Sequence, residues 1–148
     1  MRHSLTRDLP YAPGQLFDLV ADVESYPQFV RWITALKARN RRPDGEGVTL
    51  IDAEAQVKFS MINERFGTTV RLDRAHLAID VALLSGPFRK LENHWRFRPR
   101  GRGSEVSFDI DCEFRSRLLE GLLAANLGRA ASRLVRCFEV RAAQLYGG

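Results

Sequence analysis

The sequence has few of the residues that build metal, redox or disulfide sites. It contains two cysteines, Cys112 and Cys137, and three scattered histidines. Their spacing matches no metal-binding or redox motif, so we expect two reduced, buried thiols, no bound metal and no cofactor. A glycine-rich phosphate loop and a nucleophile-elbow motif are also missing, which argues against several common classes of enzyme.

Long apolar runs are absent as well. No stretch approaches the roughly 18 apolar residues that span a membrane, and the charged start of the chain has no signal-peptide core. A chain of 148 residues, 45% hydrophobic and 28% charged, is therefore expected to form one cytoplasmic domain, residues 1–148. The formal net charge of +5 favours anionic partners such as phospholipid headgroups or RNA.

Alternating apolar and polar residues predict an antiparallel sheet that is covered on one face. We expect an edge strand over 1–9, a short helix over 12–20, and six further strands over 33–42, 49–59, 64–73, 76–84, 90–98 and 105–114. Short turns rich in glycine and proline separate several of these strands, so strands that are neighbours in the sequence should pair.

The last thirty residues predict a long helix. After Ser116, a residue suited to cap a helix, apolar residues recur every three or four positions. We predict one continuous helix over 117–145, roughly 45 Å long, with Leu122, Leu127 and Leu134 buried. The predicted fold is α+β, with a curved antiparallel sheet wrapped around this helix and an apolar cavity between the two.

The inward face of the predicted sheet has few polar groups. Asn93 lies between Leu91 and Trp95, and its amide is either satisfied internally or bonded to a carbonyl or hydroxyl of an apolar ligand. Asn126, in the apolar arc of the helix, has the same two interpretations. Glu64 is the one acidic residue in an inward register, and we expect it at the rim. Such a wall favours binding over acid–base catalysis, so we predict that the protein is not an enzyme.

Aromatic residues and arginines form two further groups. The aromatic group either lines the cavity or packs in the core, and we predict that Trp32 and Phe88, which fall in expected loops, guard the entrance. The members of this group are Tyr26, Phe29, Trp32, Phe88, Trp95 and Phe97. Arg129, Arg133 and Arg136 are spaced to share one side of the helix. They form either a solvated face or a contact for anionic lipid or RNA phosphate.

Three segments resemble a known family. YPQFVRW at 26–32 and GPFRKLENHWRF at 86–97 are similar to motifs of the coenzyme Q-binding proteins. These proteins are a branch of the START-like polyketide cyclase/dehydrase and lipid transport superfamily. The segment FRSRLLEGLL at 114–123 also resembles the family's strand-to-helix junction, so the resemblance runs through nearly the whole chain. It implies a helix-grip fold and a deep hydrophobic tunnel for a ubiquinone-like ligand, bound without chemistry. Bacterial relatives have been described as ribosome-association toxins.

Three functions follow as hypotheses. The first is a quinone carrier that supports respiratory electron transfer or quinone biosynthesis. This carrier would contact the anionic inner face of the cytoplasmic membrane transiently. The expected ligand-binding residues are Phe29, Trp32, Phe88, Leu91, Asn93, Trp95, Phe97, Leu122 and Asn126. The second is a ribosome-binding protein that uses the arginines and shows steep salt dependence. The third, an aromatase/cyclase-type enzyme, is disfavoured by the lack of inward acid–base groups. We expect no DNA partner.

Overall fold

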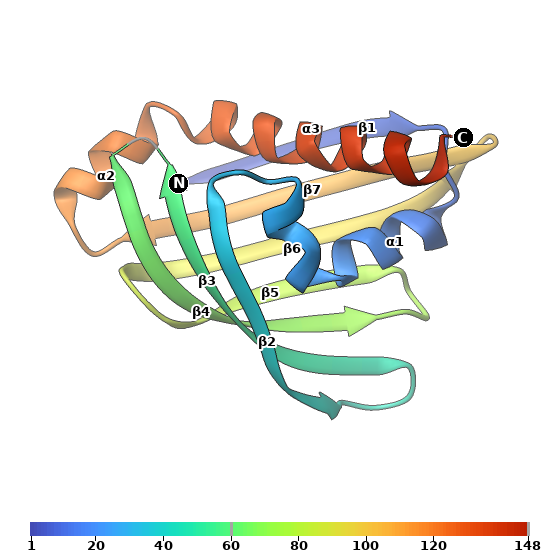
Figure 1. The fold of residues 1–148 in the computed structure, drawn as a ribbon, viewed down its shortest axis with the longest axis horizontal. Helices are drawn as coiled ribbons and strands as arrows, with labels where there is room; N and C mark the ends of the chain where they lie inside the picture. Colours follow the sequence, from blue (N-terminus) through green and yellow to red (C-terminus); the bar gives the residue numbers. More distant parts are fainter. Residues whose placement is uncertain (60, 148) are drawn as a thin grey trace.

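A seven-stranded antiparallel sheet curves around a C-terminal helix in the computed structural model, which describes residues 1–59 and 61–147 (Figure 1). The elements are β1 (Arg2–Leu9), α1 (Pro13–Ala21), the 3-10 helix η1 (Val23–Gln28), β2 (Ile33–Pro43), β3 (Val48–Phe59), β4 (Ile62–Asp73), β5 (Ala78–Ser85), β6 (Phe88–Arg100), β7 (Gly103–Phe114), α2 (Arg117–Ala124) and α3 (Leu127–Tyr146). This arrangement is the helix-grip α+β fold that the sequence predicts.

The strands β2 to β7 form an antiparallel meander, and β1 pairs with β7, so the order across the sheet is β1-β7-β6-β5-β4-β3-β2. The helices α1 and η1 connect the two edge strands. Trp95 pairs with Phe108, and Ala53 pairs with Thr68, so the residues predicted to face inward do share one face. The alternation of the sequence is thereby confirmed as a sheet with one covered face.

One end of this face is filled by α1. Its buried residues are Leu16, Phe17, Leu19 and Val20. Phe17 meets Phe97 of β6 edge to face, with ring centroids 6.1 Å apart, and adds an aromatic contact to the burial of both rings. The core is therefore solid at the α1 end of the sheet.

The C-terminal helix is broken, so the prediction of one helix over 117–145 is wrong. Ser116 does cap α2, and its hydroxyl accepts a first-turn N–H at 3.3 Å. At Asn126, however, the side-chain amide donates to the Leu122 carbonyl at 3.0 Å, while the main-chain N–H turns to the Leu123 carbonyl at 2.8 Å. The side chain thus takes the acceptor that a continuous helix would need. The helix α2 bends away from α3, which is roughly 30 Å long (Figure 1).

The helix α3 covers the sheet but does not lie close to its centre. Its backbone comes closest to β1 and α1. Its buried residues are Leu127, Ala131, Val135, Phe138 and Ala142. Burial of Leu127 is confirmed, whereas Leu122 on α2 and Leu134 on α3 are only partly buried. None of the helices in the described ranges is both long and apolar enough to cross a membrane.

Candidate functional site

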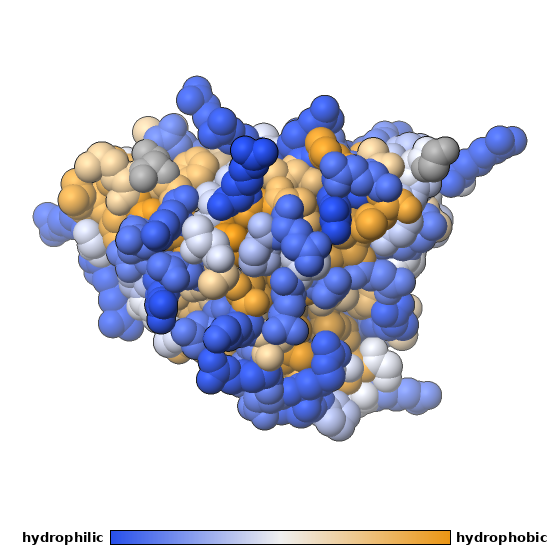
Figure 2. All heavy atoms as spheres, viewed as in Figure 1, coloured by the Kyte–Doolittle hydropathy of each residue, from blue (hydrophilic) through white to orange (hydrophobic). Residues whose placement is uncertain are grey.

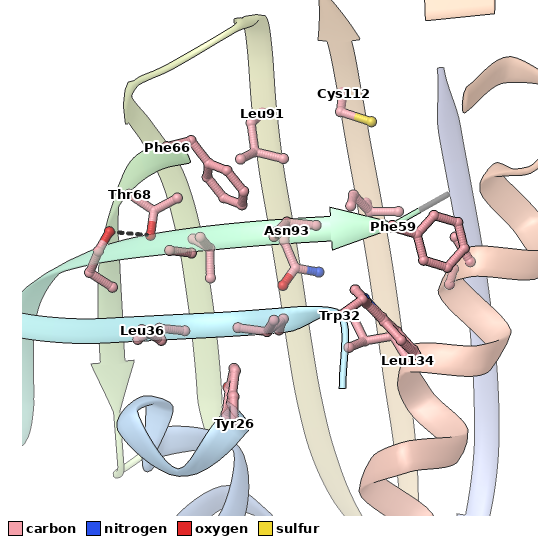
Figure 3. Close-up of a pocket in the computed structure, with 18 of the residues that line it drawn as sticks. Tyr26, Trp32, Leu36, Phe59, Phe66, Thr68, Leu91, Asn93, Cys112 and Leu134 are labelled. Atoms are coloured by element: carbon pink, nitrogen blue, oxygen red, sulfur yellow. Dashed lines mark hydrogen bonds between the residues drawn. The ribbon is translucent and has the colours of Figure 1, made fainter. Parts of the chain in front are cut away.

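A cavity of about 280 Å³ lies between α3 and the inward face of the sheet (Figure 3). Strands β2 to β7 supply one wall, and α3 and η1 supply the other. Ile79 and Phe108 lie at its buried end, and both are almost completely inaccessible to solvent. Trp32, Phe59 and Ile62 are partly exposed and mark the mouth, so the cavity opens beside the β3–β4 hairpin.

Alanines on both walls explain why this space is empty. Ala53 and Ala55 of β3 line the cavity from the sheet, and Ala130 and Ala131 line it from α3. Protein interiors are normally packed to crystal-like density, so short side chains opposite a helix that stands off from the sheet leave unfilled volume. The sequence signal for this was present, because both strand alanines fall in the inward register.

Trp95 forms the inner part of the wall. Its ring meets Phe108 and Phe138 edge to face, at centroid distances of 4.8 and 5.1 Å, and is stacked on Phe97 at 6.1 Å. These contacts hold the indole on three sides. Trp95 therefore both supports the core and presents a flat apolar surface to the cavity.

Asn93 supplies the central polar group of the wall. Its side-chain nitrogen donates to the main-chain carbonyl of Asp109 on β7 at 2.8 Å, and Figure 3 shows the oxygen turned away from that strand. An amide has two N–H donors and one oxygen acceptor. The Asn93 oxygen and its second N–H therefore remain for a ligand with a hydroxyl or carbonyl group.

The other polar side chains of the wall are largely satisfied internally. The Thr68 hydroxyl donates to the Ala53 carbonyl at 3.4 Å (Figure 3), and the Tyr26 hydroxyl donates to the Val20 carbonyl. Burial raises the pKa of Tyr26, which keeps this phenol neutral. Glu64, near the hairpin, is the one lining residue of the described chain that carries a formal charge. The cavity is therefore apolar apart from Asn93 and its rim.

Cys112 also lies on this wall. Burial raises the pKa of its thiol to about 11, so the thiol is protonated at neutral pH and behaves as an apolar group. Cys137 is partly buried on α3, and burial raises its pKa as well. In residues 1–59 and 61–147, no three His, Cys, Asp or Glu side chains gather in a way that suits a metal ion.

The structure places five of the residues predicted to bind ligand on the cavity wall. They are Trp32, Phe88, Leu91, Asn93 and Trp95. Trp32 lies at the mouth, where it meets Phe59 at a centroid distance of 5.5 Å. Phe88, in contrast, is only 8% exposed and is stacked on Phe114 at 4.6 Å. Its predicted role as an entrance residue is wrong, because it begins β6 rather than lying in a loop.

Phe29 and Phe97 lie outside the cavity lining. Phe29 packs against Phe138 at 5.1 Å and beneath the Arg141 guanidinium at 5.5 Å. Phe97 shares the inward register of Trp95 but lies two residues further along β6, where Phe17 of α1 covers it. Both belong to the core around the cavity.

Leu122 and Asn126 are also absent from the lining. The prediction relied on an unbroken helix that would turn both residues toward the sheet. Because Asn126 ends that continuity, its amide bonds the Leu122 carbonyl and its side chain is exposed. Residues that sequence reasoning left out take their place on α3, mainly Ala130, Leu134 and Phe138.

The arginine stripe of α3 is only partly available to an anionic partner. Arg129, Arg133 and Arg136 are all exposed, as predicted. Arg136 is paired with Glu139 at 3.0 Å. Arg129 and Arg133 form no ion pair with any residue that the structure describes. Two of the three positive charges are therefore free.

A curved sheet that grips a helix around an apolar cavity defines a START-like protein of the helix-grip class. The sequence matches the family described as polyketide cyclase / dehydrase and lipid transport over residues 9–139, and the chain belongs to that family. The resemblance found in the motifs is therefore confirmed.

Two relatives carry different names. The ribosome association toxin RatA of Rickettsia prowazekii (strain Madrid E) is 32% identical over 143 residues, which cover 95% of this chain and 94% of that protein. The mitochondrial coenzyme Q-binding protein COQ10 homolog B of Xenopus laevis is 30% identical over 151 residues, which cover 99% of this chain and 60% of that protein. Neither name denotes an enzyme.

Solved structures agree with the fold. The solution structure of the 18 kDa protein CC1736 from Caulobacter crescentus has a TM-score of 0.84 and 53% identity, and the match covers 100% of this chain and 99% of that one. The ZhuI aromatase/cyclase from Streptomyces sp. R1128 has a TM-score of 0.75 and 14% identity, over 100% and 98% of the two chains. The second likeness shows the fold alone.

Proposed function

We propose that this protein binds an isoprenoid quinone, or a closely related lipid, in the cavity beneath α3 and shields it from water. The observation that carries the proposal is an apolar cavity whose central polar group is the Asn93 amide. Small-molecule sites commonly combine apolar walls with a few placed polar groups. The similarity to a protein named for binding coenzyme Q supports the same ligand class.

The arrangement of the wall suggests how such a lipid would lie. The polar ring would reach Asn93 and rest against Trp95, and the tail would run toward Trp32 and Phe59 at the mouth. Each methylene group that leaves water contributes about 0.8 kcal/mol. Burial of several such groups is needed to offset the freedom that the ligand loses on binding.

Binding without chemistry fits the residues of the wall. General acid–base catalysis needs a positioned proton donor or acceptor beside the reacting atoms. Glu64 lies near the mouth, away from Asn93. Among the described residues, the cavity lining contains no histidine and no pair of charged side chains. We therefore assign the cavity to carriage or protection of a lipid, in support of respiration or quinone biosynthesis.

A cavity-filling substitution tests the proposal. Ala130→Phe places a ring in the cavity from α3, and Ala143→Phe adds the same ring at an exposed position of the same helix. In calorimetric titration with decylubiquinone, we expect Ala130→Phe to bind at least about tenfold more weakly than the wild type, because the ring and the ligand compete for one space. Ala143→Phe should bind normally. Equal affinity of all three proteins would refute the cavity as the site.

Ribosome association is the second candidate. Two observations favour it: the similarity to a protein named ribosome association toxin, and the unpaired charges of Arg129 and Arg133. Binding to RNA phosphates would weaken steeply with salt. Sedimentation with ribosomal subunits tests it. A double variant, Arg129→Glu with Arg133→Glu, should abolish pelleting if this function is correct, and Ala130→Phe should leave pelleting unchanged.

A lipid carrier also needs a membrane from which to collect its cargo. The proposal therefore includes transient contact with an anionic surface at the inner face of the cytoplasmic membrane. Anionic lipids attract basic segments by about 1 kcal/mol per arginine close to the surface. No covalent anchor or membrane-spanning element is required for such a contact.

A further inference from the structure

Two large apolar side chains are exposed at the open end of the cavity. Met61, in the β3–β4 hairpin, is 78% exposed, and Leu118, in the first turn of α2, is 72% exposed. The helix α2 has no buried residue at all. Figure 2 shows orange and pale atoms over the end of the molecule where α2 lies, at the left of the view. This end therefore exposes apolar surface that the fold does not use.

Arginines surround the same end. A shallow polar hollow at the start of α2 is lined by Arg89, Arg115 and Arg117 together with two glutamates. Arg89 and Arg117 form no ion pair with any described residue. One of the glutamates, Glu120, is occupied, because it accepts the Phe114 N–H at 2.7 Å. With three arginines against two glutamates, the hollow keeps a net positive charge.

The hollow and the cavity share a wall. Phe114, at the end of β7, lines both of them. Leu123, in the last turn of α2, lines the cavity, so one short helix carries Leu118 outside and Leu123 inside. The exposed apolar residues, the free arginines and the mouth therefore form one continuous end of the molecule.

We propose that this end, formed by α2 and the β3–β4 hairpin, docks on an anionic phospholipid bilayer. Leu118 and Met61 enter the headgroup region, and the arginines of the hollow contact lipid phosphates. The mouth of the cavity then faces the bilayer. The proposal rests on the lipid-binding function and specifies where its cargo passes. This surface is distinct from the arginine stripe of α3, in which Arg136 is paired.

A bilayer fits this surface better than RNA does. Aliphatic side chains gain free energy when they leave water for the acyl boundary, in proportion to the area buried. Leucine and methionine side chains gain little on a phosphate backbone, whose recognition depends on charge and on base stacking. The combination of Leu118, Met61 and unpaired arginines therefore points to lipid.

At the opposite end of the sheet, more of the arginines are paired and the large exposed aliphatic side chain is less exposed. There, Arg100 is bound to Glu105 at 3.0 Å and to Asp8 at 3.4 Å, so charge is largely neutralised by ion pairs. Two matched control positions lie at that end. Leu145 is 50% exposed near the C-terminus, and Arg102 is an exposed arginine in the β6–β7 turn without an ion pair in the described chain.

Vesicle sedimentation of the full chain tests the proposal. Vesicles of phosphatidylcholine alone are compared with vesicles that contain phosphatidylglycerol. We expect the wild type to bind the second kind more tightly. Leu118→Gln should weaken that binding about tenfold, since it removes an inserted side chain. Arg117→Gln should weaken it about fivefold and reduce its salt dependence. Leu145→Gln and Arg102→Gln should bind as the wild type does.

Wild-type affinity of Leu118→Gln and Arg117→Gln for anionic vesicles would overturn the proposal. Equal losses in the control variants would do the same, because they would show a general effect of hydropathy or charge. If Arg117→Gln loses ribosomal subunits while Leu118→Gln keeps both ribosomes and vesicles, the surface is for RNA and the proposal is wrong. Decylubiquinone titration separates docking from ligand binding. If Leu118→Gln binds quinone normally but loses vesicle binding, both the cavity site and the docking surface are supported. If the wild type binds quinone but does not bind anionic vesicles, only the docking proposal is refuted.

Discussion

The side-chain amide of Asn93 donates a hydrogen bond to the main-chain carbonyl of Asp109, across 2.8 Å and between neighbouring strands. This bond fixes which end of the amide is nitrogen, because only the nitrogen can donate to a carbonyl. The oxygen therefore faces away from β7, on the cavity side of the wall. A ligand hydroxyl would find an acceptor there, and a ligand carbonyl would have to use the remaining N–H.

Removal of the Asn93 amide should weaken ligand binding more than folding. Asn93→Leu keeps the size of the side chain but loses both hydrogen-bonding groups. We expect about tenfold weaker binding of decylubiquinone in calorimetric titration, the equivalent of one buried hydrogen bond. Asn63→Leu, on the outward face of β4, is the matched control. Unchanged affinity of Asn93→Leu would remove Asn93 from the site.

Loss of the Leu127 side chain should destabilise the fold. Leu127 is buried at the start of α3, so Leu127→Ala leaves a cavity beneath the helix. We expect the free energy of unfolding in urea to fall by about 2–5 kcal/mol. Leu118→Ala, an exposed leucine in α2, should change it by no more than about 0.5 kcal/mol. Similar values for the two variants would contradict the packing of α3 on the sheet.

The break between α2 and α3 should depend on Asn126. In Asn126→Ala the Leu122 carbonyl loses its side-chain donor and can accept the main-chain N–H of residue 126. Because alanine also favours helix, we expect α2 and α3 to merge. Slower hydrogen exchange of the amide at 126 would report this bond. Exchange as fast as in the wild type would mean that another feature imposes the break.

Alkaline pH should destabilise the protein through Cys112. Burial raises the pKa of this thiol from an ordinary 9.0 to about 11. Above pH 9 the unfolded chain loses this proton while the folded chain keeps it. The contribution to stability is therefore complete below pH 9 and is lost as the pH rises through 11. Urea midpoints of the wild type should fall more steeply over this range than those of Cys112→Ala, and parallel curves would contradict the shift.

The sequence was sufficient to predict the strands and which residues face inward. Successive side chains of a strand point to opposite faces, so an apolar register such as Val70 and Leu72 identifies the covered face directly. The same pattern does not report position along the strand. Trp95 and Phe97 share one register, yet only Trp95 reaches the cavity, because α1 covers Phe97. That contact joins residues far apart in the chain.

Polar residues inside apolar patterns were harder to interpret. Asn93 interrupts the apolar face of a strand and Asn126 the apolar face of a predicted helix, so the sequence supports the same two interpretations for each. The structure separates them by their partners, since Asn93 bonds a carbonyl on the next strand and Asn126 bonds the Leu122 carbonyl of the preceding helix. Phe88 shows a related difficulty, which is where a turn ends. Strand β6 already begins at Phe88, so this aromatic residue is buried in the sheet rather than exposed in a loop.

The weak packing of α2 has a kinetic consequence. Only Leu119 and Leu123 of this helix pack against the core, and both are partly exposed, so we expect α2 to detach at a small fraction of the global unfolding free energy. Because Leu123 of α2 lines the cavity, each such local opening would widen the route to the interior. The residence time of a bound lipid would then be set by the fraying of two helical turns, on a timescale of microseconds to seconds, rather than by unfolding of the sheet. A surface that holds α2 in place would lengthen that time, and one that displaces it would shorten it.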